Sequence, residues 1–450
     1  MDTTAARSPT SSAALGKPSE PMSGSRLQTR SSCLVLLTLL LTARGAVAQV
    51  HAHYSPPEGY PDWVAVRPVD PETLVPTKVV GPGDQWSKVI AEAQPGDVIA
   101  LEDGVYEGSL AVYDRAAPSA PVTVMALHSR KAVLDAEGGD PILSTYPHTV
   151  PASYWRFIGL CLVNADKRNA EFANLRHVTF QDCEFANTQK RQGLLVESGE
   201  GLVVSGCYFH HNAYGLQVGV KDQSGVKGVL IENCVFDSNA GKELSNADGV
   251  GIENALLTRD VLIRDCVSTR HSDAGFDVKP EALILRCLSR QNSGPGFKIW
   301  RSVEMRNCLA YSNREEQIEL AGATLSAYRR ILGCTVAAPG RTAIAVKGLG
   351  SFAMRNTIVD GRVEVATEGA LDVDYCLFTQ DPGPWQGRHS VVGNPMFVDP
   401  ANGDYHLREG SPAIGIGEYL PLLSPDLELK VRRQPFCAGC YEGAVEAARY

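Results

Sequence analysis

The sequence predicts an all-β protein that folds as a right-handed parallel β-helix, with an N-terminal cap and an irregular C-terminal tail. Eight cysteines recur at intervals of 21 to 32 residues between Cys161 and Cys334. Short β-rich runs broken by Asn, Gly and Asp fill each interval, and no helical pattern separates them. Such a period is typical of coils of short strands, stacked about 4.8 Å apart.

The first 48 residues indicate an export signal. An apolar run of ten residues, 34–43, follows Arg26 and Arg30 and precedes a small-x-small cleavage pattern at 46–48. The run is too short to cross a bilayer. We therefore expect residues 1–48 to be removed, with Met22 as an alternative start, and the protein to be secreted to an extracellular or periplasmic space without a membrane span. A membrane-anchoring helix is the alternative interpretation.

Three regions are expected after the signal. Residues 49–80 are Pro-rich and predict an irregular N-terminal extension. Residues 81–380 predict the β-helix, which opens with a short amphipathic helix over residues 86–93. This helix would cap the first coil, because the end of a solenoid otherwise exposes an open edge. Residues 381–450 are rich in turn residues and predict a tail that packs on the last coils.

Two side-chain ladders are expected inside the stack. Cys is commonly buried, so the recurring cysteines predict an inward row of free thiols. These cysteines are Cys161, Cys183, Cys207, Cys234, Cys266, Cys287, Cys308 and Cys334, and Cys376 resumes the pattern. A second ladder is expected in the following turn, from Asn212, Asn239, His271, Asn292 and Asn313. Cys437 and Cys440 lie outside the repeat and either stay free or form a local disulfide.

Stacking the repeats brings polar residues of distant segments together. Strand alternation predicts an inward row of Leu216, Val250, Phe276, Phe297 and Ile318. It predicts an outward row of Gln217, Gly251, Asp277, Lys298 and Glu319. Asp248 and Asp273 precede two of these strands and are expected at neighbouring turn positions. We therefore expect Asp248 and Asp273 to cluster with the outward residues Asp277 and Lys298.

Three carboxylates in one cluster repel each other unless a cation joins them. Hard oxygen ligands on turns suit Ca²⁺, with water or backbone carbonyls completing the shell. The alternative is a solvated polar face with an ion pair between Asp277 and Lys298, which would contribute little to stability.

Charge excludes a general nucleic-acid binder. The chain has 42 Lys and Arg against 51 Asp and Glu, a net charge of −9, whereas phosphate neutralisation needs an excess of basic residues. A polyanionic partner would need positive charge supplied locally, by a few placed side chains or by a bound cation.

Three segments carry a resemblance to a known family. Residues 246–249 (Asn-Ala-Asp-Gly), 272–277 (Ser-Asp-Ala-Gly-Phe-Asp) and 294–298 (Gly-Pro-Gly-Phe-Lys) resemble the motifs of polysaccharide lyase family nine, which comprises β-helical pectate lyases and related enzymes. The resemblance implies a calcium site formed by Asp248, Asp273 and Asp277, with Lys298 as the Brønsted base. The sequence departs from the family at Ala274, where the family has a second Asp, and in the single-coil spacing to the Lys.

The implied activity is β-elimination on a uronate-containing, pectate-like polysaccharide by a monomeric enzyme. Removing the C5 proton builds charge on the adjacent carboxylate, which Ca²⁺ stabilises as a Lewis acid. Trp300 and Arg301 are predicted to bind the sugar ring and its carboxylate, although Trp300 could equally pack between coils. Lys279 is a further substrate-binding residue, an alternative base or a solvated surface lysine. Two other functions stay open: a glycoside hydrolase that uses two of the carboxylates, and a non-catalytic carbohydrate-binding surface protein.

Overall fold

The computed structural model describes residues 59–443, apart from residues 115, 140, 146–150, 222–223, 242–245, 254–255, 323 and 367–370. The chain divides into two compact units, Met1–Tyr54 and Ser55–Tyr450, and every described residue belongs to the second. The predicted export signal at 1–48 lies outside the described residues.

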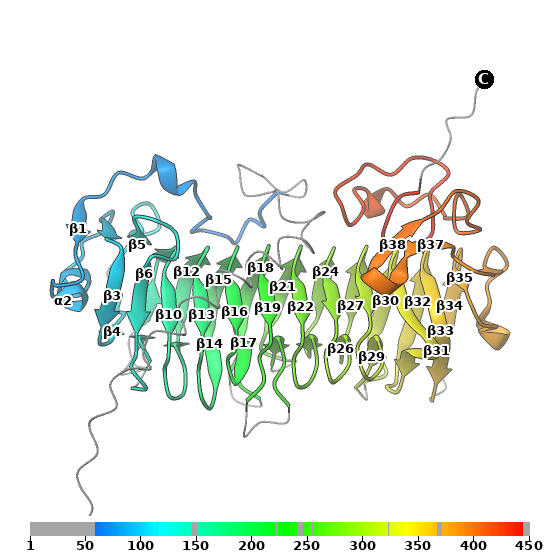
Figure 1. Ribbon diagram of the computed structural model, residues 1–450, viewed down its shortest axis with the longest axis horizontal. Coiled ribbons are helices and arrows are strands. Elements are labelled where there is room, and N and C mark those ends of the chain that lie inside the picture. Colours follow the sequence, from blue (N-terminus) through cyan, green and yellow to red (C-terminus); the bar gives the residue numbers. More distant parts are fainter. Residues whose placement is uncertain are drawn as a thin grey trace, which may run out of the picture. The chain divides into compact units, whose positions relative to one another are not determined.

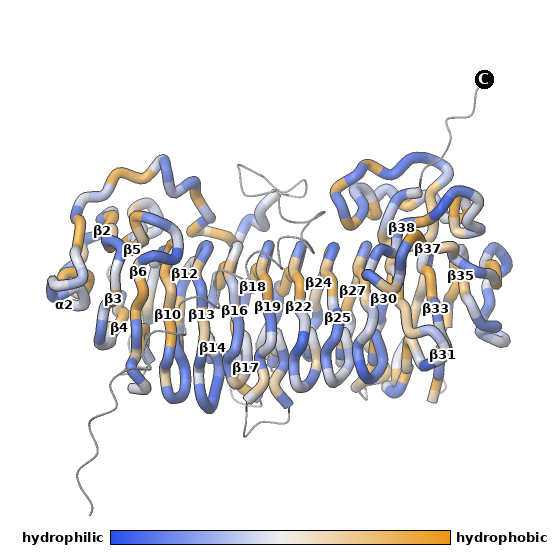
Figure 2. The backbone as a smooth tube through the Cα atoms, viewed as in Figure 1, coloured by the Kyte–Doolittle hydropathy of each residue, from blue (hydrophilic) through white to orange (hydrophobic). Residues whose placement is uncertain are grey.

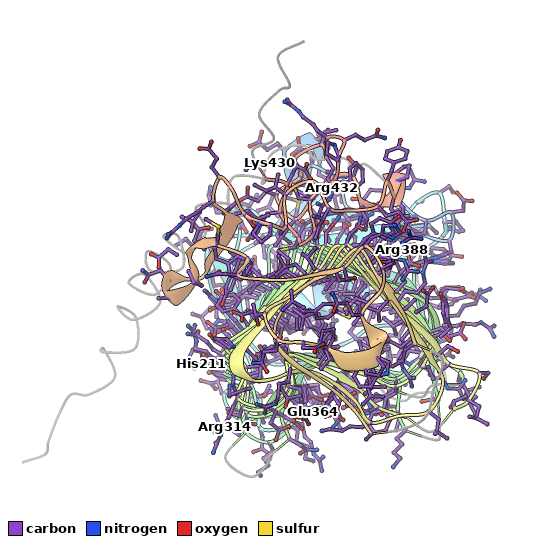
Figure 3. The ribbon with its side chains drawn as sticks, turned by 90° about the vertical axis from the view of Figure 1, so that its right-hand side faces the viewer. His211, Arg314, Glu364, Arg388, Lys430 and Arg432 are labelled. Carbon is purple, nitrogen blue, oxygen red and sulfur yellow. The ribbon has the colours of Figure 1, made fainter. Side chains whose placement is uncertain are left out.

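The second unit is a parallel β-helix, as the sequence predicts (Figure 1). Most coils contribute one strand to each of three sides, and their strands pair in parallel with those of the next coil. The first side is a 14-stranded sheet, and the second and third sides together form a 22-stranded sheet. Figure 3 looks along this stack.

The strands follow one another in the same order in successive coils. The first side consists of β1 (Lys78–Val80), β2 (Val98–Leu101), β5 (Val122–Ala126), β8 (Ala152–Ser153), β9 (Trp155–Ile158), β12 (Leu175–Gln181), β15 (Gly199–Ser205), β18 (Val226–Glu232), β21 (Arg259–Arg264), β24 (Ala282–Leu285), β27 (Val303–Arg306), β30 (Tyr328–Leu332), β32 (Ser351–Arg355) and β34 (Leu371–Asp374). The second side consists of β3 (Gly104–Glu107), β6 (Ala132–Asp135), β10 (Cys161–Val163), β13 (Glu184–Ala186), β16 (Tyr208–His210), β19 (Val235–Asp237), β22 (Val267–Thr269), β25 (Leu288–Arg290), β28 (Leu309–Tyr311), β35 (Leu377–Phe378) and β36 (Val391–Val392). The third side consists of β4 (Leu110–Ala111), β7 (Leu143–Ser144), β11 (Ala170–Phe172), β14 (Gln192–Val196), β17 (Tyr214–Val218), β20 (Val250–Ile252), β23 (Phe276–Val278), β26 (Phe297–Ile299) and β29 (Ile318–Leu320). Two long strands, β31 (Thr335–Val346) and β33 (Ile358–Val365), run through both the second and the third side.

One continuous apolar core fills the coils. A single cluster of buried side chains extends from Val80 to Phe378, and Figure 2 shows hydrophilic residues gathered at the turns along the lower edge of the stack. Aromatic rings stack between coils, as for Phe276 and Phe297, whose ring centroids lie 5.0 Å apart. Burying a side chain of this size stabilises a fold by about 1.5–3 kcal/mol, so the repeated core accounts for a long solenoid with short strands.

The cysteine ladder exists, but Cys161 is not part of it. The backbone carbonyl of each ladder cysteine accepts a hydrogen bond from the first N–H of the second-side strand in the next coil. In the coil of Cys161, the residue whose carbonyl accepts this bond is Leu160. Cys161 instead pairs with Glu184 as a strand residue, so its assignment to the ladder was wrong by one position. A shift of one residue moves a strand side chain to the other face. All eleven described cysteines are free thiols and buried, including Cys437 and Cys440.

The turn ladder confirms the alignment of the repeats, including the histidine. The N–H of Asn239 donates to His271 Nδ1 at 3.2 Å, and the N–H of His271 donates to Asn292 Oδ1 at 3.1 Å. Burial lowers the pKa of His271 to about 4, so the imidazole is neutral and can accept a hydrogen bond in place of an amide oxygen.

The N-terminal end of the stack is covered. The predicted cap forms as helix α2 (Trp86–Ala91), which buries Trp86 and Ile90 against the first coil. The coil strands reach beyond the expected limits of 81 and 380, because β1 pairs with β2 and β36 pairs with β35. No helix in the described part of the chain has the length and apolar character that crossing a bilayer requires.

The extension and the tail pack on the outside of the coils. Residues of the extension bond to the first side, as where the Val69 N–H donates to Gln181 Oε1 at 2.9 Å. The tail inserts Arg432, which donates to Asn307 Oδ1 at 2.7 Å, and Figure 3 labels this arginine above the coils. The short elements of these segments are η1 (Pro71–Thr73), η2 (Gly383–Trp385), β37 (Phe397–Asp399), η3 (Pro400–Asn402), β38 (Asp404–Leu407) and η4 (Pro421–Leu423).

Candidate active site

The predicted residues lie on the third side of the stack, along the lower edge in Figure 1. We call the outer surface of β17, β20, β23, β26 and β29, with the residues directly flanking these strands, the site face. Strand pairing sets Gly251 beside Asp277, and Asp277 beside Lys298. Gln217 and Glu319 continue the row on either side. The predicted stacking of these strands is therefore confirmed.

Asp248 is almost fully buried, with 6% of its surface exposed. One carboxylate oxygen accepts the Tyr214 hydroxyl at 2.7 Å, and the other accepts the Ala274 N–H at 2.9 Å. Burial, followed by the charge of Asp277, raises the pKa of Asp248 well above its usual range. A nearby cation would relieve this penalty, because it stabilises the charged form.

Asp273 lies at the turn position next to the one opposite Asp248, as the sequence predicts. Its N–H donates to the carbonyl of Ala247, whereas Ala274 lies opposite Asp248 in the neighbouring coil. Asp273 is more exposed than Asp248. Burial and the charges of Asp277 and Glu319 raise its pKa, while Lys298 lowers it.

Asp277 is held on both oxygens. Trp300 Nε1 donates to Oδ1 at 2.6 Å, and Lys279 Nζ donates to Oδ2 at 3.1 Å. The Lys279 ammonium also donates to Glu253. The alternative interpretation, a solvated polar face, predicted an ion pair between Asp277 and Lys298. This ion pair is absent among the described residues, and Asp277 pairs with Lys279 instead.

The two lysines differ in how they are held. Burial lowers the pKa of Lys279, but Asp277 and Glu253 outweigh it and raise the pKa above its usual value. Lys298 makes no ion pair with any described carboxylate, and its Nζ lies 5.5 Å from the centroid of the Trp300 ring. The uncharged form that a base requires is therefore disfavoured at Lys279, which leaves Lys298 as the better candidate base.

Trp300 is fixed against the charged groups. Its indole N–H is bound by Asp277, and the ammonium groups of Lys279 and Lys298 lie 5.9 and 5.5 Å from its ring centroid. Cations at this distance from an indole face are attracted by the ring quadrupole. Arg301 follows in the turn before β27 and is partly exposed.

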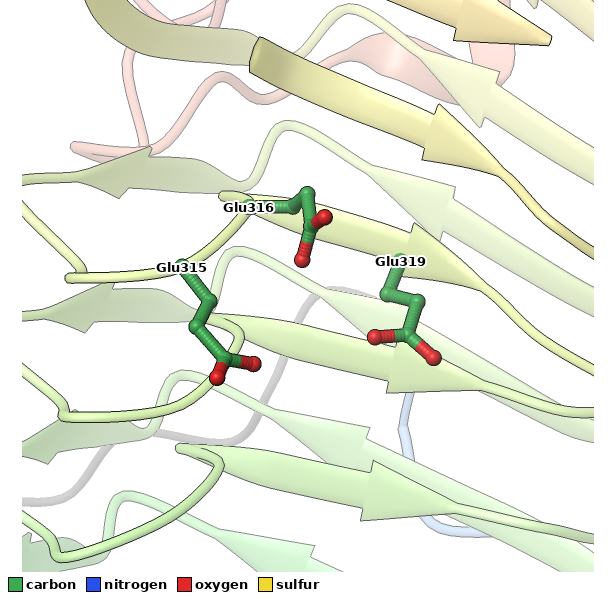
Figure 4. A group of neighbouring side chains, drawn as sticks. All are labelled: Glu315, Glu316 and Glu319. Carbon is green, nitrogen blue, oxygen red and sulfur yellow. The ribbon is translucent and has the colours of Figure 1, made fainter. Parts of the chain in front are cut away.

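A second acidic group lies farther along the site face. Glu315, Glu316 and Glu319 are the one group of three acidic, His or Cys side chains in the described chain whose ligand atoms all lie within 4.8 Å of one another (Figure 4). Lys347 pairs with Glu316 at 3.1 Å and with Glu319 at 3.2 Å. Sequence reasoning placed only Glu319 on this face.

The three predicted calcium ligands match calcium in kind. They are hard oxygen donors from adjacent coils, and burial, with the charge of Asp277 added, raises the pKa values of Asp248 and Asp273. Their oxygens do not all lie within 4.8 Å of one another, and those of Asp277 already accept hydrogen bonds. The residues therefore fit a weak calcium site, in which Asp277 must loosen its present contacts.

Two contributors were missed from the sequence, Tyr214 and Glu253. A methyl group on Gly251 would lie 1.9 Å from the Tyr214 hydroxyl, so the space beside this glycine is needed by the phenol. Tyr214 and Asp248 are each followed by a glycine and then by an inward-facing residue. This shared pattern could have identified Tyr214 from the sequence. Glu253 lies two residues after Gly251 on the same strand face.

Parallel three-sided coils and a face of carboxylates and lysines define a β-helix protein with a polar site on one side. The sequence model of the Pel9A-like right-handed β-helix region matches residues 75–324. This match covers more than half of the 450 residues. The chain therefore belongs to the Pel9A-like right-handed β-helix family.

Several solved structures are similar to this chain. Pectate lyase Pel9A is 16% identical over 82% of this chain and 98% of its own, with a TM-score of 0.48. A variant of the alginate lyase AlyGC, of polysaccharide lyase family 6, is 11% identical over 83% of this chain and 58% of its own, with a TM-score of 0.50. An alginate lyase from Paenibacillus sp. str. FPU-7 is 15% identical over 67% of this chain and 99% of its own, with a TM-score of 0.44. At these identities the likeness concerns the fold alone. No curated protein matches the sequence.

Proposed function

We propose that this protein is a polysaccharide lyase that cleaves a uronate-containing, pectate-like acidic polysaccharide by β-elimination. The observation that carries the proposal is Lys298, a half-buried lysine on the site face that forms no ion pair with any described carboxylate. The motifs that resemble polysaccharide lyase family nine support it. So does the matching family model, which takes its name from Pel9A, a pectate lyase.

In the proposed reaction, Lys298 in its uncharged form removes the C5 proton of a uronate bound over the site face. The C5 electron pair then forms a C4–C5 double bond as the C4–O bond breaks, and the departing sugar oxygen takes up a proton from water. Asp248, Asp273 and Asp277 would hold Ca²⁺, which supplies Lewis-acid stabilisation of the substrate carboxylate when bound. Lys279 and Arg301 would bind substrate carboxylates, and Trp300 would offer a ring face to the sugar.

The two other functions make different demands on these residues. A glycosidase needs an acid and a base that both reach the bond, but Asp248 and Asp277 are nearly buried and hydrogen-bonded within the protein. A non-catalytic protein that binds an acidic carbohydrate could also use an unpaired lysine, so the matching family model is what favours a lyase over this alternative.

We further propose that the protein is exported by the predicted signal at 1–48 and acts as a monomer on extracellular or periplasmic polysaccharide. The absence of an overall basic charge fits a substrate bound by a few local cations rather than a nucleic acid.

The deciding experiment is a screen of polygalacturonate, alginate and other polyuronates, with calcium and with a chelator. A lyase produces absorbance from the new double bond. A glycoside hydrolase produces new reducing ends without that absorbance, and a binding protein retains the polysaccharide without cleaving it at any calcium concentration. Either of these two results would overturn the proposed reaction.

A further inference from the structure

We propose that the Lys279 ammonium competes with calcium for Asp277 and thereby keeps the calcium affinity of the site low. This inference rests on the calcium site proposed above, and it concerns a residue that the family motifs do not include.

The position of Lys279 follows from the stacking of three coils. The backbone N–H of Lys279 donates to the carbonyl of Ile252 in the preceding coil. The backbone N–H of Trp300, in the next coil, donates to the carbonyl of Val278, the residue before Lys279. Lys279 thus lies between Glu253 on one side and Trp300 on the other. Its side chain is only 22% exposed, so the ammonium is enclosed by these neighbours rather than free in solvent.

The ammonium occupies the oxygen that a metal ion would need. Lys279 Nζ lies 3.1 Å from Asp277 Oδ2, and Trp300 Nε1 holds Oδ1. Calcium binds carboxylate oxygens at about 2.3–2.6 Å. A divalent ion at that distance would place two cations within a few ångströms of each other, where like charges repel strongly in a partly buried site. Calcium must therefore displace Lys279 from Asp277.

Glu253 provides the place to which the lysine can retreat. The ammonium already bonds to Glu253 as well as to Asp277, so leaving Asp277 breaks one ion pair and keeps the other. Displacement is then possible without exposing an unpaired buried charge, but it costs binding free energy that a site without Lys279 would keep. Lys298 is not a competitor of this kind, because it makes no ion pair with Asp277 among the described residues.

The test is a calorimetric titration with CaCl₂ of the full protein and of the Lys279→Met and Lys279→Arg variants. The Met variant should bind calcium about tenfold more tightly or better, because the competing charge is gone. The Arg variant should stay near the wild type, since guanidinium keeps the positive charge. Lys190→Met is the matched control. It removes an exposed ion pair with Asp166 elsewhere on the stack and should leave calcium binding unchanged.

Terbium luminescence is a second measurement, independent of calorimetry, that shows where the ion binds. A Tb³⁺ ion at Asp277 would lie close to the Trp300 indole and should show sensitised emission, which Trp300→Phe should remove and added calcium should compete away. Lys279→Gln serves as a second variant if the Met substitution does not fold. Wild-type or weaker calcium affinity in a folded Lys279 variant would overturn the inference.

Failure of the inference and failure of the proposed function are distinguishable. Neither titration involves polysaccharide turnover. Tighter calcium binding by Lys279→Met in a protein that cleaves no polyuronate would support the competition and contradict the lyase. Unchanged calcium binding in a protein that cleaves polyuronates would do the reverse.

Discussion

Two groups of carboxylates on the site face each form ion pairs with a lysine. They differ in which charged side chains are left without an ion pair. Near the C-terminal coils, Lys347 pairs with both Glu316 and Glu319 and is 48% exposed. In the middle coils, Lys279 pairs with Glu253 and Asp277, while Asp248 and Asp273 form no ion pair among the described residues. Lys298 adds an ammonium without an ion pair. The comparison teaches that close acids paired with a lysine need no further cation, whereas carboxylates without an ion pair beside an unpaired lysine mark a candidate site.

The largest effect is expected at the unpaired lysine. Lys298→Ala should lower turnover on a uronate polysaccharide by about 10²–10⁴-fold, the usual contribution of a positioned base. Polysaccharide binding and thermal stability should change little. Turnover is measured as absorbance of the unsaturated product.

Lys298→Arg is the matching variant and should also fail, because guanidinium stays protonated. Wild-type turnover in Lys298→Ala would show that Lys298 is not the base. If Lys298→Ala unfolds the protein, Lys298 has a structural role. The carboxylate group of the middle coils would then resemble the Lys347 group more closely.

The next effect is expected from restoring the acid that the family motif has at Ala274. This side chain is fully buried opposite Asp248. Ala274→Asp adds a buried charge beside another, so the metal-free protein should lose about 2–4 kcal/mol of stability. Calcium should bind more tightly and recover the loss. Melting curves with chelator and with calcium check this, and an unchanged calcium titration would show that the ion does not bind at this position.

A smaller effect is expected from removing the buried charge of Asp248. Asp248→Asn should stabilise the metal-free protein at pH 7 by about 1–2 kcal/mol. The carboxyl's folded pKa lies above its unfolded value, so ionisation penalises the folded state. The gain should vanish as pH falls below about 4, where the acid is protonated in both states. The gain in stability should reach its full size at pH values above the raised pKa of Asp248 in the folded protein.

Denaturant unfolding across pH measures this difference. Glu316→Gln in the other group is the control and should give no gain, because Lys347 already neutralises Glu316. An equal gain from both substitutions would erase the distinction between the two groups.

The smallest effect is expected at Lys347. Lys347→Ala should cost about 0–1 kcal/mol, less at high salt, because its ammonium is largely exposed. Product absorbance should stay at the wild-type rate. A large loss of turnover would mean that the substrate also occupies the Glu316 and Glu319 end of the face.

Much of the arrangement followed from the repeat. Aligning the turn residues placed Asp277 beside Lys298 and predicted that His271 substitutes for an asparagine, and both are confirmed. One detail failed by a single residue, at Cys161. Strand side chains alternate every residue, so a shift of one position in a loosely matched repeat changes the face or the neighbour.

The sequence by itself determined the period of the coils, the inward row of apolar residues and the segments that share the site face. These depend on backbone spacing and burial, which repeat along the chain. Only the tertiary structure decided that Lys279 rather than Lys298 holds Asp277, with Glu253 as its second partner and Tyr214 over Gly251. Long side chains can reach several acceptors, and the choice depends on distances of a few ångströms that coil stacking alone does not specify.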